Sequence, residues 1–176
     1  MKTLIINGSP RENGNCAKVI NYLKQNIGGE ISVCNCCTEN IAHCTGCDAC
    51  KSGSCAIEDD MRQYYEKIRR ADNIIIVSPL YFSMLTGGLL TFASRWQFFY
   101  NNPIKTAKKG AVILLGGGST KDTSKAYSTA NIILRYAGVK NPECAAFVGT
   151  DRENPLKNAE FTEKLNELAK KCTTPP

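Results

Sequence analysis

Four cysteines lie close together in the first third of the chain, where they could ligate a metal or carry redox chemistry. Their spacing is C-x2-C-x2-C-x4-C. A bacterial-type iron–sulfur cluster is held by a comparable run, C-x2-C-x2-C-x3-C-P, which differs in the last gap and in the final proline. The spacing therefore makes these four residues candidate ligands of a [4Fe-4S] cluster: Cys44, Cys47, Cys50 and Cys55.

Two other interpretations of this cysteine run stay open. The thiols are free or form a labile disulfide, or they hold zinc, although a structural zinc site normally has two cysteine pairs separated by a longer loop. The other six cysteines lie outside the run. We expect three to be thiols without function at a strand edge and three to be packing residues. The first three are Cys34, Cys36 and Cys37, and the second three are Cys16, Cys144 and Cys172.

A polar segment at residues 8–16 follows the first apolar run and precedes the first helical pattern. The N-terminus of a helix presents unpaired N–H groups and a partial positive charge, which suit an anion. Ser9 adds a hydroxyl and Arg11 a planar guanidinium that fits phosphate. Gly14 allows a close backbone approach, and Asn15 can donate its amide. The P-loop and Gly-x-Gly-x-x-Gly patterns are both absent, so we predict a different type of phosphate-binding loop, the alternative being a polar helix cap.

Two further loops carry residues that suit a flat aromatic ligand. Tyr81 and Phe82 follow the third apolar run, and such a ligand is bound by apolar and aromatic walls with a few backbone hydrogen bonds. A plug over the core is the alternative there. The fourth run is followed by three glycines in the loop at residues 116–120, which either permit close ligand approach or form a simple turn.

The elements that must position these loops are five apolar strand-like runs that alternate with five helical patterns. This order favours a parallel sheet covered on both faces, in a doubly wound α/β fold. Five strands favour the flavodoxin-like order 2-1-3-4-5, with the ligand at the carboxyl ends of the strands. We expect strands at residues 3–7, 30–36, 73–78, 110–115 and 144–148. We expect helices at 16–27, 61–71 (capped by Asp59 and Asp60), 85–100, 123–137 and 156–171, and a cysteine-rich loop at 37–58.

The composition fits one ordinary globular domain over residues 1–176. The chain is 43% hydrophobic and 22% charged, and no apolar run approaches the ~20 residues that cross a bilayer. The absence of a signal-peptide pattern predicts a cytoplasmic protein that does not bind membranes. A net charge of +6 suits anionic small molecules or is simply a solvated surface, and no basic run of nucleic-acid-binding density is present.

Four segments taken together resemble one family. Gly-Ser-Pro-Arg-x-x-Gly-Asn at residues 8–15, the cysteine run, Glu-Asp-Asp-Met at 58–61 and Ser-Pro-Leu-Tyr-Phe at 78–82 are similar to the NADPH-dependent FMN reductases, and within them to the iron-sulfur flavoproteins. The resemblance covers residues 1 to about 120. It implies that FMN phosphate is bound by Ser9, Arg11, Asn15 and Cys16, and the isoalloxazine by Pro79, Leu80, Tyr81, Phe82, Ser83, Gly116, Gly117 and Gly118.

The resemblance implies further features and has departures. It implies NAD(P)H as electron donor, a homodimer or tetramer, and the four run cysteines as cluster ligands. The family usually has Ser or Thr at the position of Cys16, and a thiol is a weaker donor. It often has Lys and Asp where Leu90 and Ser94 stand, while Arg95 remains, so we expect the ion pair of that helix to be missing.

These observations predict an FMN-dependent oxidoreductase that acts with a small-molecule or protein electron donor or acceptor. It would be an NAD(P)H-dependent reductase of flavin or quinone, or an iron-sulfur flavoprotein. One alternative is a flavodoxin-type electron carrier without its own substrate, although Arg11 and the positive charge disfavour it. The other is a thiol or zinc redox sensor on the same fold. His43, the single histidine, is expected at the surface with no catalytic role.

Overall fold

The computed structural model describes residues 1–118 and 122–174 and contains a five-stranded parallel sheet in the order β2-β1-β3-β4-β5. The central strands consist of continuous apolar residues, as expected for strands buried on both faces. The predicted flavodoxin-like α/β fold is confirmed. The strands are β1 (Lys2–Asn7), β2 (Glu30–Asn35), β3 (Asn73–Pro79), β4 (Lys109–Gly116) and β5 (Glu143–Val148).

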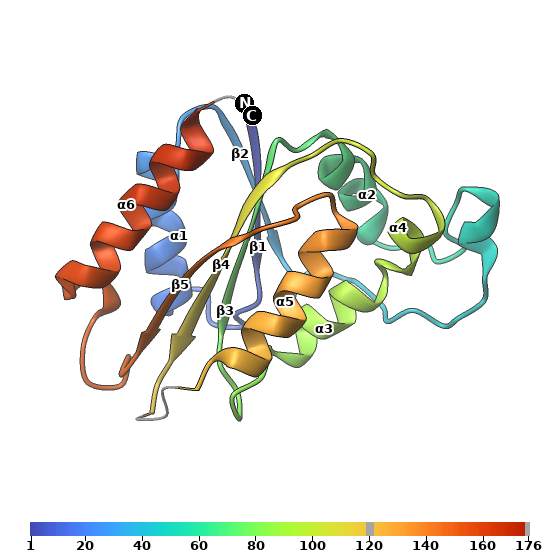
Figure 1. Ribbon diagram of the computed structural model, residues 1–176. Helices are drawn as coiled ribbons and strands as arrows, with labels where there is room; N and C mark the ends of the chain where they lie inside the picture. The colour runs from blue at the N-terminus through green and yellow to red at the C-terminus, as the bar shows by residue number, and fades with distance from the viewer. Residues whose placement is uncertain (119–121, 175–176) are drawn as a thin grey trace.

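Helices cover both faces of this sheet, with α1 and α6 on one face and α2, α3, α4 and α5 on the other (Figure 1). The apolar core accordingly has two parts, one on each face. The α-helices are α1 (Asn15–Asn26), α2 (Met61–Arg70), α3 (Gly87–Ser94), α4 (Gln97–Asn101), α5 (Ser124–Tyr136) and α6 (Ala159–Thr173), and the 3-10 helices are η1 (Ala49–Ser52) and η2 (Pro155–Lys157).

The single helix predicted for residues 85–100 is wrong, because the chain forms two helices there, α3 and α4. Between them the N–H groups of Arg95 and Trp96 donate to carbonyl oxygens three residues back, at Phe92 and Ala93, over 3.2 and 2.9 Å. These tighter bonds turn the chain, so that α4 follows a new direction (Figure 1). The predicted apolar face is nevertheless buried along both helices.

Two smaller predictions also differ from the structure. The last helix does not begin at residue 156, because the side chain of Asn158 accepts the N–H of Phe161 at 2.9 Å and caps α6 at that point. Cys144 is exposed and does not pack in the core, because it lies on β5 at the edge of the sheet. Cys16 and Cys172 are buried, as predicted.

Candidate functional site

The loops that follow β1, β3 and β4 meet along one edge of the sheet, at the lower end of the strands in Figure 1. The N–H of Gly8 donates to the carbonyl of Val77 at 2.8 Å, which joins the first loop to β3. The N–H of Leu80 donates to the carbonyl of Leu115 at 2.8 Å, which joins the second loop to β4. Strand order reverses at β1 and β3, where ligands bind in sheets of this type.

The loop at residues 8–16 presents a helix N-terminus without a side-chain cap. The N-cap residue Gly14 is extended, and no side chain caps the N-terminus of α1. Ser9 is buried; its N–H donates to Oδ1 of Asn7 at 3.0 Å, and its Oγ accepts the N–H of Arg11 at 3.2 Å. The Arg11 side chain is exposed. An uncapped N-terminus beside a guanidinium is a suitable environment for a phosphate.

Two of the predicted phosphate residues have side chains that are directed elsewhere. Cys16 is 2% exposed, and burial raises the pKa of its thiol to about 12, although a hydrogen bond with Ser9 opposes the rise. The predicted phosphate contact of Cys16 would therefore have to come from its backbone N–H. The Asn15 amide nitrogen lies 3.5 Å from the carbonyl of Thr150, in the loop after β5.

The second loop ends in a tight turn at residues 81–84. Tyr81 and Met84 exchange two backbone hydrogen bonds of 3.0 Å. Phe82 and Ser83 between them have φ values of 53° and 61°, the conformation of a type I′ turn. Phe82 is 96% exposed, and Tyr81 is 43% exposed. A turn that holds a bare aromatic ring in a strained backbone is the kind of feature that occurs at ligand and partner sites.

The loop after β5 was missed by the sequence prediction. The N–H groups of Gly149 and Thr150 donate to the carbonyl of Gly116 at 2.8 and 3.0 Å. A Cβ built on Gly117 would lie 2.6 Å from a carboxylate oxygen of Asp151, so a side chain there would require the exposed Asp151 carboxylate to move. Asp151 lies in a loop that follows a strand end, as the three predicted loops do. The sequence of this loop contains no recognisable binding motif. Ser119 and Thr120 of the predicted third loop lie outside the described residues.

Two cavities lie to the sides of the three loops. One of about 580 Å³ lies between β5 and α6 and includes Gly118. The other, of about 330 Å³, lies between α1 and β2 and includes Ser9. Neither includes residues 79–83, and the side chains of Tyr81 and Phe82 in that segment are exposed.

The four predicted cluster ligands line a single small cavity of about 20 Å³ between the cysteine loop, which we define as residues 42–58, and the helices α2 to α4. Nitrogen donors are directed at three of the sulfur atoms. Arg95 Nη2 lies 3.2 Å from Sγ of Cys55, Asn101 Nδ2 lies 3.0 Å from Sγ of Cys50, and the N–H of Gly46 lies 3.5 Å from Sγ of Cys44. Such donors stabilise cysteine thiolates and tune the clusters they bind.

The geometry of the cysteine loop differs from a site for one metal ion. Within residues 1–118 and 122–174, no three His, Cys, Asp or Glu side chains converge as ligands of one ion. A four-iron cluster separates its sulfur ligands more widely, because each thiolate binds a different iron. Burial raises the pKa of Cys55, but the nearby N–H of Ile57, the Tyr65 hydroxyl and the Arg95 guanidinium together outweigh it, and the pKa is lowered overall. The donor set fits a thiolate-bound cluster.

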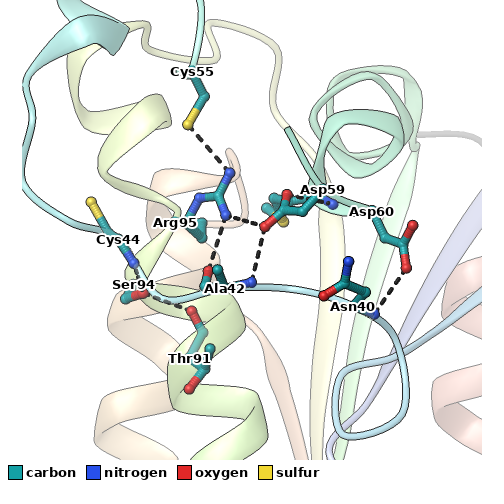
Figure 2. A network of polar contacts seen from close by, with 10 residues as sticks. Asn40, Ala42, Cys44, Cys55, Asp59, Asp60, Thr91, Ser94 and Arg95 are labelled. Atoms are coloured by element: carbon teal, nitrogen blue, oxygen red, sulfur yellow. Dashed lines mark hydrogen bonds and ion pairs between the residues drawn. The ribbon is translucent and has the colours of Figure 1, made fainter. Parts of the chain in front are cut away.

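A buried ion pair fixes the base of the cysteine loop (Figure 2). Arg95 Nη1 lies 2.5 Å from Oδ2 of Asp59 and 3.0 Å from the carbonyl of Ala42. The ion pair expected to be missing is therefore replaced by one with a partner from another segment. Leu90 is exposed, and Ser94 accepts the N–H of Cys44 at 2.9 Å.

Helix α3 joins the predicted flavin loops to the cysteine loop. At its N-cap, Thr86 Oγ1 donates to the carbonyl of Gly8 at 2.7 Å. At its other end, Ser94 and Arg95 bind the cysteine loop. The helix has eight residues, which corresponds to a length of about 12 Å. The cysteine loop is thus one short helix away from the predicted flavin loops.

Comparison with known families agrees with this geometry. The sequence pattern of the family described as NADPH-dependent FMN reductase matches residues 1–153. The chain belongs to this family. It is also 32% identical over 143 residues to an iron-sulfur flavoprotein of Archaeoglobus fulgidus, which covers 79% of this chain and 64% of that protein. An iron-sulfur flavoprotein of Methanosarcina thermophila is 34% identical over 144 residues, 79% of this chain and 75% of that protein.

Solved structures share the fold of this reductase-family chain at low sequence identity. The NAD(P)H:quinone oxidoreductase from Methanothermobacter marburgensis has a TM-score of 0.72 at 17% identity, over 98% of this chain and 96% of that one. An FMN-dependent NADH-azoreductase from Bacillus anthracis, solved with FMN, has a TM-score of 0.65 at 15% identity, over 98% and 99%. The predicted family and fold are confirmed. Among the described residues, no helix combines the length and apolar character of a membrane span.

Proposed function

We propose that this protein is an FMN-dependent oxidoreductase that takes electrons from NAD(P)H or a protein donor. The observation that carries the proposal is the convergence of the loops after β1, β3 and β4 beside an uncapped helix N-terminus. FMN supplies electron and hydride transfer when bound, and the protein supplies binding, orientation and electrostatics. Family membership and the names of the relatives support the same function.

The residues of the first loop would bind the phosphate end of FMN. The backbone N–H groups at the start of α1 point out of the helix and are favourable for a dianion, and Arg11 adds a charge-assisted contact. The Ser9 hydroxyl accepts from Arg11 N–H and retains its own proton for donation. Gly14 fits this function, because it leaves the approach to the helix open.

The second and third loops would hold the ring system. The backbone at Phe82 and Ser83 would offer hydrogen-bonding groups to the ring edge, because the N–H groups of Leu80 and Tyr81 are already bonded within the protein. The side chains of Tyr81 and Phe82 would shield the ring from water. Gly116, Gly117 and Gly118 allow the ring to lie against the backbone of the third loop. No side chain here needs to act as a proton donor or base.

FMN binding and turnover test the proposal directly. Purified protein should take up FMN and absorb near ~450 nm, which is a property of the flavin. Arg11→Gln should bind FMN about tenfold more weakly, as expected for the loss of a charge-assisted bond. Arg62→Gln, which removes an exposed guanidinium from α2, is the matched control. Failure of the wild-type protein to bind FMN would overturn the proposal, and turnover of NADH or NADPH with a quinone separates a reductase from a flavodoxin-type carrier.

We further propose that the four run cysteines hold a [4Fe-4S] cluster that exchanges electrons with the flavin. The grouping of the four cysteines around one cavity and the nitrogen donors at three sulfurs support this assignment. The cavity of about 20 Å³ has room for about one water molecule, so the loop must open further to hold the cluster. Anaerobically reconstituted protein should contain about four iron and four sulfide per chain. One zinc per chain with no sulfide would instead favour a zinc sensor.

The remaining proposals concern the whole molecule. We treat residues 1–176 as one flavin-binding domain that forms a homodimer or tetramer in the cytoplasm. Large apolar side chains exposed on the second loop and on α3 and α5 support an oligomer: Phe82, Met84, Leu90, Ile132 and Tyr136. All ten cysteines are unpaired, in accord with a reducing compartment. Light scattering during size-exclusion chromatography tests the oligomer, and a monomer would contradict it.

A further inference from the structure

Arg95 binds the cysteine loop at two points far apart in the sequence. Its guanidinium donates to the carbonyl of Ala42 at 3.0 Å and to Sγ of Cys55 at 3.2 Å (Figure 2). These residues lie at the two ends of the loop, outside Cys44 on one side and at the last cysteine on the other. One planar group therefore sets the distance between the two ends.

Asp59 holds that guanidinium in place and contacts the same loop. Its Oδ2 accepts from Arg95 at 2.5 Å and from the N–H of Ala42 at 2.9 Å, and its Oδ1 accepts the N–H of Met61 at 3.1 Å. Both the N–H and the carbonyl of Ala42 are thus bound by the ion pair (Figure 2). Asp59 also fixes the start of α2, which ties the loop to the core.

Neighbouring polar residues of the same helices bind the other parts of the loop. Ser94 Oγ accepts the N–H of Cys44 at 2.9 Å and donates to the carbonyl of Thr91 at 2.7 Å. Asn101 donates to Sγ of Cys50, and Asn102 Nδ2 donates to the carbonyl of Cys50 at 2.8 Å. The end of α3 and the end of α4 therefore present donors and acceptors to three of the four cysteines.

Burial of this ion pair carries a desolvation cost that lowers its net contribution to the stability of the folded protein. Arg95 is 2% exposed, among apolar and aromatic residues of the core. Removal of a guanidinium and a carboxylate from water costs several kcal/mol per ion, and a packed apolar pair is often as stable. An apolar pair, however, could not bond the carbonyl of Ala42 and the sulfur of Cys55. The cysteine loop needs such bonds because it has little apolar core of its own.

We infer that Arg95 is a positioning residue that holds the cysteine loop in a ligand-ready arrangement, with Asp59 fixing its orientation. The functional consequence of this inference rests on the proposed cluster. The positioning role itself rests only on the contacts that Arg95 makes within the protein. Lysine cannot replace arginine in this role, because a single ammonium lacks the planar fork that bonds Asp59, Ala42 and Cys55 together.

Hydrogen exchange of the metal-free protein tests the geometry with Arg95→Lys and Arg95→Gln, and with Arg70→Gln as the control, because the exposed Arg70 pairs with Glu66 inside α2. In both Arg95 variants the amides of the cysteine loop should exchange about tenfold faster or more, reflecting easier local opening. Arg95→Lys should keep the charge beside Asp59, so the amides of the central strands should exchange nearly as in the wild type. If the loop amides of Arg95→Lys or of Arg95→Gln exchange as slowly as those of the wild type, the inference is wrong.

A double variant covers the case in which a single variant fails to fold. Asp59→Asn with Arg95→Met removes both charges, so that no buried ion is left unpaired. We expect a folded protein that binds FMN as the wild type does and still has fast exchange in the cysteine loop. Loop exchange equal to that of the wild type would overturn the inference.

Iron retention tests the functional consequence. After anaerobic reconstitution, Arg95→Lys and Arg95→Gln should release iron to a chelator about 10–100-fold faster than the wild type, the range seen when groups that support metal ligands are removed. The midpoint potential of the remaining cluster should become more negative in Arg95→Gln and change less in Arg95→Lys, because only glutamine removes the positive charge. Wild-type release rates in both variants would contradict the inference. Absence of iron from the wild type would instead overturn the proposed cluster, and loop exchange would then decide on Arg95 alone.

Discussion

Nη1 of Arg95 lies 2.5 Å from Oδ2 of Asp59, and the two side chains are only 1% and 4% exposed. The residues are 36 positions apart; Arg95 directly follows α3, and Asp59 lies two residues before the start of α2. Burial tends to raise the pKa of Asp59, but its hydrogen bonds to Arg95 and to the N–H groups of Ala42 and Met61 lower it overall. The pair joins the cysteine loop to the core of the domain.

Loss of the Asp59 charge should be strongly destabilising. Asp59→Asn leaves the buried Arg95 guanidinium without a counter-ion, which costs about 3–5 kcal/mol. Urea unfolding monitored by circular dichroism measures this change. The matched control is Glu58→Gln, which breaks an exposed pair with Arg62 and should cost less than about 1 kcal/mol. Equal effects of the two substitutions would show that the buried pair has no special contribution.

Asp59 also predicts a dependence of stability on acid pH. Because its pKa is lower in the folded protein than in the unfolded chain, folding favours the ionised form. The resulting stability is present in full above the unfolded-state value of about 3.9 and is lost as the pH falls through the folded-state pKa. The free energy of unfolding of the wild type should therefore fall more steeply below about pH 4 than that of Asp59→Asn. Parallel pH profiles would contradict this assignment.

The turn at Phe82 and Ser83 should lower the stability of the apoprotein while its exposed ring contributes to binding. Two non-glycine residues at positive φ each cost about 1–3 kcal/mol, whereas Asn-Gly is the preferred pair in a type I′ turn. The double substitution Phe82→Asn with Ser83→Gly should raise the free energy of unfolding of the apoprotein by about 1 kcal/mol or more. It should also weaken FMN binding or self-association, because the exposed ring is removed. An FMN affinity and an oligomeric state that both match the wild type would show that this turn has no binding role.

Gly8 should tolerate a side chain poorly. A Cβ there would lie 3.0 Å from Oγ of Ser78 and 3.2 Å from two atoms of Leu89, so Gly8→Ala should destabilise the protein by about 1–3 kcal/mol and weaken FMN binding. Gly87→Ala is the control, because a Cβ there meets no atom within 4 Å among the described residues and alanine favours the helix. Calorimetry and FMN titration of the two variants should differ clearly, and equal behaviour would contradict the tight approach of β1 to β3.

The strands and loops could be predicted because their signals are local. Ile74, Ile75, Ile76 and Val77 form a continuous apolar run, which identifies a buried strand, and the polar loops at strand ends followed from the fold. The break at Arg95 could not be predicted in this way. Apolar residues continue across it at Leu89, Phe92, Trp96 and Phe99 with helical spacing, so the sequence pattern is that of one helix.

The parts of the site that escaped prediction depend on contacts between distant segments. Asp59 was predicted only as a helix cap, and its pairing with Arg95 has no local signal. The positive φ of Phe82 has none either, because no glycine marks the turn. Asp151 lies over Gly117 only because β5 ends beside β4. In each case the tertiary arrangement determines the conformation.

The length of α3 constrains how this chain can change during evolution. Its first residue follows Thr86, which is bonded to Gly8, and its last precedes Arg95, which is bonded to the cysteine loop. One inserted residue would rotate Arg95 by about 100° relative to Thr86, because a helix has 3.6 residues per turn. An insertion that is harmless in an exposed loop would, within α3, move the contacts of Thr86 and of Arg95 out of register with each other. Related chains that keep both sites should therefore vary in the length of the cysteine loop more readily than in the length of this helix.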